Sequence, residues 1–405
     1  MPVGIEKLDM YVGKLMVDAL DLAEARGRDR ASTLAQVMME SRSVTPVWED
    51  AVTLAVNAAK RLLAGEEMAD IELLIVGTES AVDFAKPIST WVHRFCGLPS
   101  SCRSFEVKHA CYGGTAALKM AASWVASAAR PGKKALVVSS DLTRRSTRDH
   151  FDFVGGGCAV AMLVSAQPDI LEIDLSRTGY WTSEIYDAWR PTFRLETVDN
   201  EISLFSYLDA LEGAFENYQQ AAPGDYRNDF KRHIYHAPFP GMTLHAHRTL
   251  LGGLGADRSA IQESFDRKVA GGISIGKRIG TAYGSSTFIS LMSLLQPGSD
   301  LEQGDRVSIF SYGSGCQGEF YDGVIGPRAG ERMAKLDIDS MLEERWPLTV
   351  EEYERVECVR GEQFDKPDSS VNHATVPGAY EQLYRGRNLL VLDRVEDHRR
   401  MYAWS

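Results

Sequence analysis

Cys111 has the sequence surroundings that best suit covalent chemistry. It lies in HACYGGTAA, where the strand-like run SFEVK turns sharply through Gly113 and Gly114 and continues as a helix of small residues to about Ala128. A thiol at the N-terminus of a helix meets the partial positive charge of that helix, which lowers the thiol pKa and favours the thiolate. The adjacent glycines also permit close approach by a thioester. The pattern predicts a catalytic nucleophile, and a small buried thiol is the alternative.

Glu79 and His236 each follow a short apolar strand, in IELLIVGTES and RHIYHAPFPGM. A carboxylate at a strand end can be partly desolvated, which raises its pKa toward the range useful for proton transfer. A histidine in such a place can donate to a carbonyl oxygen or relay a proton. The ordinary alternatives are a solvated loop acid for Glu79 and a core histidine for His236 or for the nearby His233.

The segment SYGSGCQGEF contains a glycine-rich turn around Gly313 and Ser314. Backbone N–H groups in such a turn could point at one spot, as an oxyanion hole requires, although a plain hairpin turn explains the same letters. Cys158, in the middle of GGGCAVAMLVS, is expected in the core. That segment does not fit a dinucleotide fingerprint, because no G-x-G-x-x-G opens a helix after a strand.

The composition is that of a folded protein, with 405 residues, 44% hydrophobic and 25% charged residues, and a formal charge of −12. The negative charge argues against broad binding of nucleic acid or of an anionic membrane, although a local basic patch could hold a phosphorylated cofactor or an acidic protein. The N-terminus lacks a signal peptide pattern and no apolar run is long enough to span a bilayer, so we expect a cytoplasmic protein. Six scattered cysteines without zinc-ligand spacing are interpreted as thiols, and no metal site is predicted.

The order of the expected elements occurs twice. The first series consists of strands at 3–12, 71–80, 133–141 and 155–165, with helices at 48–65 and after Cys111. The second consists of strands at 170–179, 232–236, 306–315 and 319–326, with helices at 203–220 and 280–296. We therefore predict two similar α/β halves, residues 1–168 carrying Glu79 and Cys111, and residues 169–405 carrying His236 and Ser314. Residues after about 330 are expected to add a helical layer and a final strand near 388–395.

Six motifs together resemble the 3-hydroxy-3-methylglutaryl-CoA synthase family in order and spacing over nearly the whole chain: GTESAVDFAKP, VKHACYGGTAALKMA, RPTFRLETVDNEISLFSYL, HAPFPGM, IGTAYGSSTF and FSYGSGCQGEF. The resemblance implies a thiolase-like fold, in which two βαβαβ-type halves form a layered α/β/α/β/α core with added C-terminal elements. It also implies a homodimer and no tightly bound cofactor, the substrates being carried on phosphopantetheine of an acyl carrier protein or of coenzyme A.

The resemblance further implies a role for each candidate residue. Cys111 accepts an acetyl group, Glu79 removes a methyl proton from it, and the enolate attacks a β-carbonyl that His236 polarises. Hydrolysis then releases a 3-hydroxy-3-methylglutaryl-type thioester. The oxyanion and acyl-binding positions are Ser314, Gly313, Thr281 and Tyr283, with the N–H of Cys111 as a second oxyanion donor.

The wording KHACYGGTA, and HAPFPGM followed by AHRTLL, resembles the branch of the family that works in polyketide β-branching. There a donor acetyl-acyl carrier protein and an acceptor β-ketoacyl carrier protein replace coenzyme A. Arg248 and His247 are the candidates for the carrier or pantetheine entrance. Two positions depart from the family pattern: Thr281 stands where relatives have asparagine, and Val154 where relatives offer a hydroxyl.

Three alternatives stay open at this point. The first is a mevalonate-pathway synthase acting on acetyl-CoA and acetoacetyl-CoA. The second is a ketosynthase or thiolase of the same fold, although those resemble a cysteine with His/Asn or His/Cys partners and lack the strand-end glutamate. The third is a non-catalytic module that binds carrier proteins.

Overall fold

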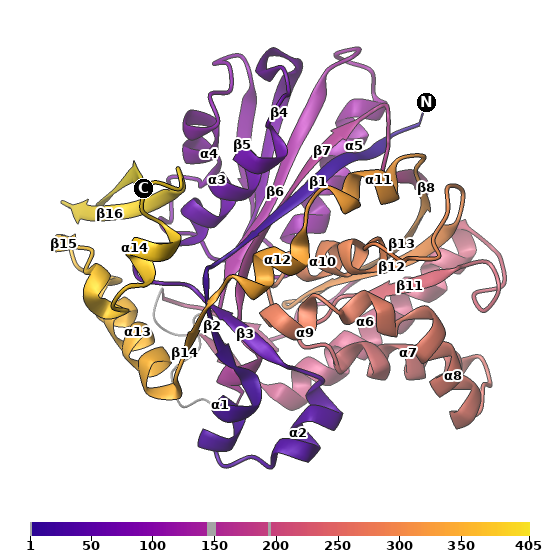
Figure 1. Cartoon of the computed structure of the whole chain (residues 1–405). Helices are drawn as coiled ribbons and strands as arrows, with labels where there is room; N and C mark the ends of the chain where they lie inside the picture. Colours follow the sequence, from indigo (N-terminus) through magenta and orange to yellow (C-terminus); the bar gives the residue numbers. More distant parts are fainter. Residues whose placement is uncertain (1, 144–150, 193–195) are drawn as a thin grey trace.

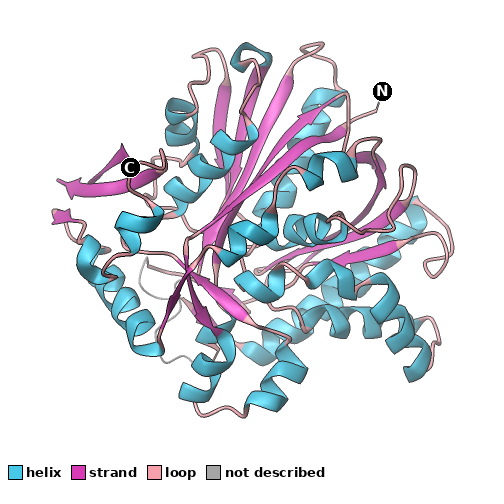
Figure 2. Ribbon diagram, viewed as in Figure 1, coloured by secondary structure: helices cyan, strands magenta, loops and turns pink. Residues whose placement is uncertain are grey.

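A mixed sheet crosses the molecule in the computed structural model, which describes residues 2–143, 151–192 and 196–405 (Figures 1 and 2). In the described residues it has nine strands in the order β11-β12-β13-β8-β1-β7-β6-β4-β5. The strands are β1 (Gly4–Val12), β4 (Ile71–Gly77), β5 (Arg103–Val107), β6 (Lys134–Leu142), β7 (Gly157–Ser165), β8 (Leu171–Thr182), β11 (Arg232–Tyr235), β12 (Arg306–Gly313) and β13 (Gln317–Ile325).

The strand pairing repeats between the two parts of this sheet. In the first part β1 pairs antiparallel with β7, β7 antiparallel with β6, and β6 parallel with β4. In the second part β8, β13, β12 and β11 pair in the same pattern. A short antiparallel contact, Gly4 with Glu172 and Ile5 with Leu171, joins the two parts edge to edge. The repeated order of elements that the sequence predicts therefore corresponds to a repeated pattern of strand pairing.

Helices lie on both sides of each part of the sheet. Helices α5 (Gly113–Ala126) and α10 (Ser285–Leu294) pack between the two parts in one shared core. Helix α3 (Ala51–Leu62) covers the outer face of the first part, and α6 (Asn200–Ala221) that of the second. Many small residues in α5 allow this close central packing. The predicted α/β/α/β/α layering is confirmed.

The C-terminal residues add a further layer beside α3, coloured yellow in Figure 1. Trp48 anchors it, because its ring meets those of His373, Tyr380 and Tyr384 edge-on at 5.4 to 5.5 Å. Instead of one final strand the structure has the hairpin β16–β17. The elements are α11 (Ala329–Ala334), α12 (Ile338–Glu343), β14 (Trp346–Leu348), α13 (Val350–Gln363), β15 (Ser369–Ser370), α14 (Ala379–Leu383), β16 (Leu390–Glu396) and β17 (Arg399–Trp404).

A small sheet, β14-β2-β3, pairs this addition with an N-terminal segment for which the sequence analysis predicts no strand. Each strand is only three or four residues long, too short for a periodic signal. The remaining elements are β2 (Leu15–Asp18), α1 (Ala19–Ala25), α2 (Arg30–Val37), β3 (Ser41–Val44), α4 (Ser89–Phe95), β9 (Ala188–Trp189), β10 (Thr197–Val198), α7 (Met242–Gly253), α8 (Arg258–Lys268) and α9 (Gly276–Ile279). Across the described ranges, no helix has the length and apolar character needed to cross a bilayer.

Candidate active site

Cys111 lies in the turn between β5 and α5, two residues before the helix begins. The preceding residue, Ala110, is left-handed with φ of 42°, a conformation that L-residues adopt only when their surroundings enforce it. The end of β4 packs directly on this turn, because a Cβ at Gly77 would lie 2.4 Å from the carbonyl oxygen of Gly113. Glycine is therefore required at position 77. The predicted place of Cys111 at a strand-to-helix turn agrees with the structure.

The predicted lowering of the thiol pKa is wrong. Burial, together with the negative charges of Glu79, Asp141, Glu196 and Asp187, raises the pKa of the Cys111 thiol well above its usual value. These carboxylates lie far apart in the sequence, so the sequence alone does not show that they act together on the Cys111 thiol. Cys111 is a protonated thiol at neutral pH, and acylation must remove its proton.

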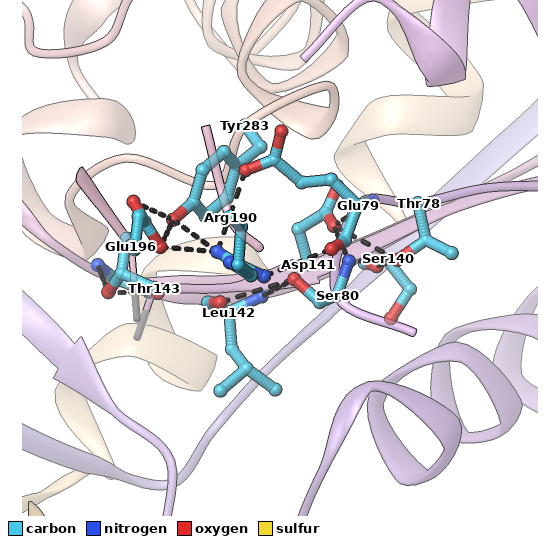
Figure 3. Close-up of polar contacts among 11 residues, drawn as sticks. Thr78, Glu79, Ser80, Ser140, Asp141, Leu142, Thr143, Arg190, Glu196 and Tyr283 are labelled. Atoms are coloured by element: carbon cyan, nitrogen blue, oxygen red, sulfur yellow. Dashed lines mark hydrogen bonds and ion pairs between the residues drawn. The ribbon is translucent and has the colours of Figure 1, made fainter. Parts of the chain in front are cut away.

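Glu79 follows β4 in a loop that the buried side chain of Asp141 holds in place (Figure 3). Asp141 Oδ1 accepts the N–H of Glu79 at 2.9 Å, the N–H of Ser80 at 3.1 Å and the hydroxyl of Thr78 at 3.0 Å. Burial raises the pKa of Asp141 to about 7, against the lowering effect of these hydrogen bonds and of Arg190. Gly77, two residues before Glu79, packs on the turn that carries Cys111, and the charge of Glu79 raises the pKa of the Cys111 thiol, so both residues belong to one site.

Arg190, directly after β9, contributes a cation to this site (Figure 3). Its guanidinium forms an ion pair with Glu196, lies 3.8 Å from Glu79 Oε1, and donates to the Glu79 carbonyl oxygen at 3.0 Å. It also donates to the hydroxyl oxygen of Tyr283 at 3.3 Å. Burial alone would lower the pKa of Arg190, but Tyr283, Glu196 and Glu79 raise it above its usual value.

His236 follows β11 and is 1% exposed. Burial lowers its pKa to about 3, so the ring is neutral. Nδ1 lies 2.8 Å from Ser286 Oγ, which accepts the N–H of Ala237 at 3.4 Å. The serine hydrogen is then best used toward Nδ1, which leaves the proton of the neutral ring on Nε2. Nε2 finds no partner among the described residues, so it is an N–H donor ready for a ligand oxygen.

The N-terminal residues of α10 connect the Cys111 turn with His236. A Cβ at Gly284 would lie 2.8 Å from the carbonyl oxygen of Cys111, and Ser285 Oγ donates to the carbonyl oxygen of Ser139 at 3.0 Å. Ser286, the next residue, holds His236. Residues from β6, the β5–α5 turn and the end of β11 are thus brought together around α10.

The turn that carries Gly313 and Ser314 packs against the other side of the Cys111 turn. A Cβ at Gly313 would lie 2.6 Å from the carbonyl oxygen of His109, so only glycine fits there. The buried carboxylate of Asp187 fixes the turn, accepting the hydroxyl of Tyr312 at 2.6 Å and the N–H of Gly315 at 2.9 Å. Ser314 is half-buried beside it.

Thr281 and Val154, the two departures from the family pattern, lie together. The N–H of Thr281 donates to the carbonyl oxygen of Val154 at 2.9 Å. Two residues later, Tyr283 is left-handed with φ of 47°, and its hydroxyl donates to Glu196 at 2.9 Å. Tyr283 therefore reaches the Arg190 ion pairs, whereas Thr281 contacts the backbone.

His247 does not lie at an entrance. It is fully buried on α7, where Nδ1 meets the hydroxyl of Tyr235 at 2.9 Å and Nε2 meets Ser264 Oγ at 3.0 Å. Burial lowers its pKa to about 4. The predicted entrance role is incompatible with this position, because α7 turns His247 toward the core. Arg248, the next residue, is exposed.

Three buried histidines should make the protein sensitive to acid. Burial lowers the pKa of His233 well below its usual value, that of His236 to about 3 and that of His247 to about 4. Below pH 6.5 the unfolded chain gains protons that the folded chain does not, so stability is lost as the pH falls from about 6.5 to about 3. The expected slope approaches about 4 kcal/mol per pH unit for three protons. Denaturant unfolding from pH 7 to pH 5 measures this slope. The His247→Asn variant should lose the contribution of one proton, about a third of the slope. A free energy of unfolding that does not change with pH would show that the three histidines are not buried in the neutral form.

Asp141, Arg190, Glu196 and Asp187 are site residues that the sequence analysis does not single out. A signal existed for Asp141, because it ends the apolar strand KKALVVSSD as Glu79 ends its own strand. Arg190 begins the motif RPTF, but nothing in that motif indicates an ion pair with Glu79. All six cysteines are free, and Cys158 is buried as predicted. In the part of the chain that the structure describes, no cluster of His, Cys, Asp or Glu could hold a metal ion.

Two family models match the chain. One is described as hydroxymethylglutaryl-coenzyme A synthase N terminal and covers residues 1–169. The other is described as hydroxymethylglutaryl-coenzyme A synthase C terminal and covers residues 256–405.

Individual relatives match over nearly their whole length. The chain is 36% identical to the polyketide biosynthesis 3-hydroxy-3-methylglutaryl-ACP synthase PksG of Bacillus subtilis, over 99% of both chains. It is 33% identical to a hydroxymethylglutaryl-CoA synthase of Enterococcus faecalis, over 87% of this chain and 91% of the relative. Among solved structures, the curacin biosynthetic pathway HMG synthase superposes with a TM-score of 0.95 at 36% identity over 100% of both chains, including complexes with apo, holo and acetyl donor-ACP.

Proposed function

The chain belongs to the hydroxymethylglutaryl-CoA synthase family, and from this premise we propose that it condenses an acetyl group held on Cys111 with a β-ketoacyl carrier-protein thioester in polyketide β-branching. It is a carbon–carbon bond-forming acyltransferase with the thiolase-like fold that the resemblance implies. The observation that supports the proposal is that the N-terminal residues of α10 contact both the Cys111 turn and His236, while β4, which leads to Glu79, packs on the same turn. The similarity to PksG and to the curacin enzyme supports a carrier protein as donor.

The first step transfers acetyl from the donor thioester to sulfur. Cys111 Sγ attacks the acetyl carbonyl, and the carbon–sulfur bond to the phosphopantetheine arm breaks. The proton that the thiol loses leaves on the departing pantetheine thiol. The exchange therefore leaves the net charge of the site, including the four carboxylates that act on Cys111, unchanged. The N–H groups of Cys111 and Ser314 hold the oxyanion.

The second step forms the carbon–carbon bond. Glu79 takes a methyl proton from acetyl-Cys111, and the resulting enolate carbon attacks the β-carbonyl carbon of the acceptor. The Nε2–H of His236 donates to the ketone oxygen as charge develops there, and the alkoxide takes up the proton that Glu79 removed from the methyl group. Water then cleaves the bond between the acyl carbon and Cys111 Sγ. This leaves a free carboxylate on the product and restores the thiol.

Other parts of the proposal concern the whole molecule. The halves divide at residues 168 and 169, and Thr281, Tyr283 and Gly313 border the acyl pocket. The exposed Arg248 attracts the acidic surface or phosphate of a carrier protein. The enzyme works as a cytoplasmic homodimer without a tightly bound cofactor, taking an acetyl carrier protein as donor and a β-ketoacyl carrier protein as acceptor. The edge strand β5 offers the surface through which the two subunits of the homodimer pair.

The donor can be identified by intact-protein mass spectrometry. We expect acetyl-carrier protein to acetylate Cys111 at least about 10-fold faster than acetyl-CoA, because binding energy from the carrier's protein surface is unavailable to coenzyme A. The Arg248→Glu variant should reduce loading from the carrier protein and leave loading from acetyl-CoA unchanged. Faster loading from acetyl-CoA would favour the mevalonate-pathway reaction, and the absence of any adduct would favour a non-catalytic binding module.

A further inference from the structure

The guanidinium of Arg190 lies near two carboxylates, those of Glu79 and Glu196. Arg190 makes its closer ion pair with Glu196, and its guanidinium lies 3.8 Å from Glu79 Oε1 (Figure 3). The side chains of Arg190, Glu79 and Glu196 are 15%, 17% and 8% exposed, so solvent screens these charges only in part. A full ion pair would make Glu79 a weak base, and the absence of any cation would hinder its ionisation.

Tyr283 fixes the shared arrangement. Its hydroxyl donates to both carboxylate oxygens of Glu196, at 2.9 and 3.1 Å, and accepts from Arg190 at 3.3 Å. Arg190 also donates to the backbone carbonyl oxygen of Glu79 at 3.0 Å. The guanidinium therefore holds the backbone of residue 79 while its charge is directed mainly at residue 196.

We propose that Arg190 and Glu196 are positioning residues that set the basicity of Glu79: Arg190 keeps Glu79 ionised, and Glu196 draws the guanidinium aside so that Glu79 can still take a proton from the acetyl group. This inference rests on the proposed function and deepens it, because it concerns the base of the condensation step. It predicts opposite effects for the loss of the two charges.

Among the described residues, the charged and titratable groups considered around Glu79 lie on four elements. Arg190 and Glu196 belong to the segment between β9 and β10, Asp141 to the end of β6, Tyr283 to the loop before α10, and Cys111 to the turn before α5. Acetylation removes the Cys111 thiol from the titration. The pH profile of a pre-acetylated enzyme then reports on Glu79 with Asp141, Arg190 and Glu196 around it.

The test measures single-turnover condensation of pre-acetylated enzyme with an acetoacetyl thioester between pH 5 and pH 9. With Glu196→Gln the pH midpoint should fall by about one unit, because Arg190 then turns its charge on Glu79. The plateau rate should fall about threefold, because only part of a change in basicity reaches the rate. With Arg190→Met the midpoint should rise by about one unit, because Glu79 then loses the positive charge that lies 3.8 Å from its carboxylate and keeps the negative charge of Glu196 nearby. The double variant, which removes one charge of each sign, should return the midpoint toward that of the wild type.

A second measurement requires no turnover. Glu196 is one of the charges that raise the pKa of Cys111, so iodoacetamide should alkylate Cys111 faster in Glu196→Gln and more slowly in Arg190→Met at pH 8.5. Peptide mapping by mass spectrometry follows Cys111 separately from the other cysteines. If the wild type acquired no acetyl group from any donor, the proposed function would fail, and this alkylation experiment would still decide the charge arrangement.

Asp169→Asn is the matched control. Asp169 pairs with Arg332 at 2.6 Å and follows the end of β7, whereas the site lies beside the start of β7. This change removes two ion pairs at the opposite end of the sheet, with Arg332 at similar burial and with the more exposed Arg328, and should leave both readouts unchanged. Shifts of the same sign in Glu196→Gln and Arg190→Met, or shifts no larger than those of Asp169→Asn, would overturn the inference.

Discussion

Replacing Cys111 by alanine is expected to abolish the acetyl adduct and to slow condensation by about 10⁶-fold, as removal of a covalent nucleophile does elsewhere. The alanine removes the sulfur to which the acetyl group binds, while the turn between β5 and α5 keeps its backbone. The methyl side chain of alanine fits at a half-buried position. Intact-protein mass spectrometry measures the adduct, and a coupled assay of product release measures the rate.

The control for this experiment is Cys358→Ala, which removes the exposed thiol on α13. It should load one acetyl group as the wild type does. An adduct of the same stoichiometry on Cys111→Ala would show that another residue accepts the acetyl group, and the proposed reaction would then be wrong.

The place of Cys111 follows from local sequence, but its ionisation does not. A strand, two glycines and a helix of small residues are contiguous in HACYGGTAA, so the turn can be predicted from those letters alone. The carboxylates that oppose thiolate formation come from the loop after β4, the end of β6 and the segment around β9 and β10. Only the tertiary fold brings them together, and burial then outweighs the effect of the helix N-terminus.

The difference between local sequence and position in the fold also explains why His247 is buried and not at an entrance. In the sequence His247 and Arg248 are neighbours, and both look suitable for a phosphate or a carrier protein. Successive residues of a helix point in directions about 100° apart, so α7 buries one side chain and exposes the other. A single helix of 12 residues with weak amphipathicity gives little basis for choosing between them.

The fold could be predicted further than the site. Long helices such as α3 give a clear periodic signal and strands such as β7 give a continuous apolar run, and the repeated order of these elements indicated two matching halves. The short strands β2 and β3 pair with each other, and β2 depends on the distant strand β14, whereas β17 pairs with the adjacent strand β16. The same dependence on distant partners hid Arg190 and Asp187, whose roles exist only through the residues they contact.

Replacing Glu79 by glutamine should separate the two halves of the reaction. Glutamine keeps the size of the side chain and cannot accept a methyl proton at useful rates, so condensation should slow by about 10²- to 10⁴-fold. Acetylation of Cys111 should persist, because that exchange passes its proton to the departing thiol. Loss of the Glu79 charge should also lower the thiol pKa, since this carboxylate is the first of the charges that raise it. Loading should therefore be as fast as in the wild type or faster.

Pre-steady-state mass spectrometry can follow both events in one experiment. With an acetyl donor and an acceptor present, the Glu79→Gln enzyme should accumulate as acetyl-Cys111, whereas the wild type should turn over. A donor whose acetyl methyl group is deuterated should slow the residual condensation and leave loading unchanged, because only condensation breaks a carbon–hydrogen bond. If Glu79→Gln condensed at the wild-type rate, Glu79 would not be the base, and a ketosynthase-like reaction without this carboxylate would fit better. If it failed to acquire acetyl at all, Glu79 would be needed for the first step, and the separation of roles between Glu79 and Cys111 would be wrong.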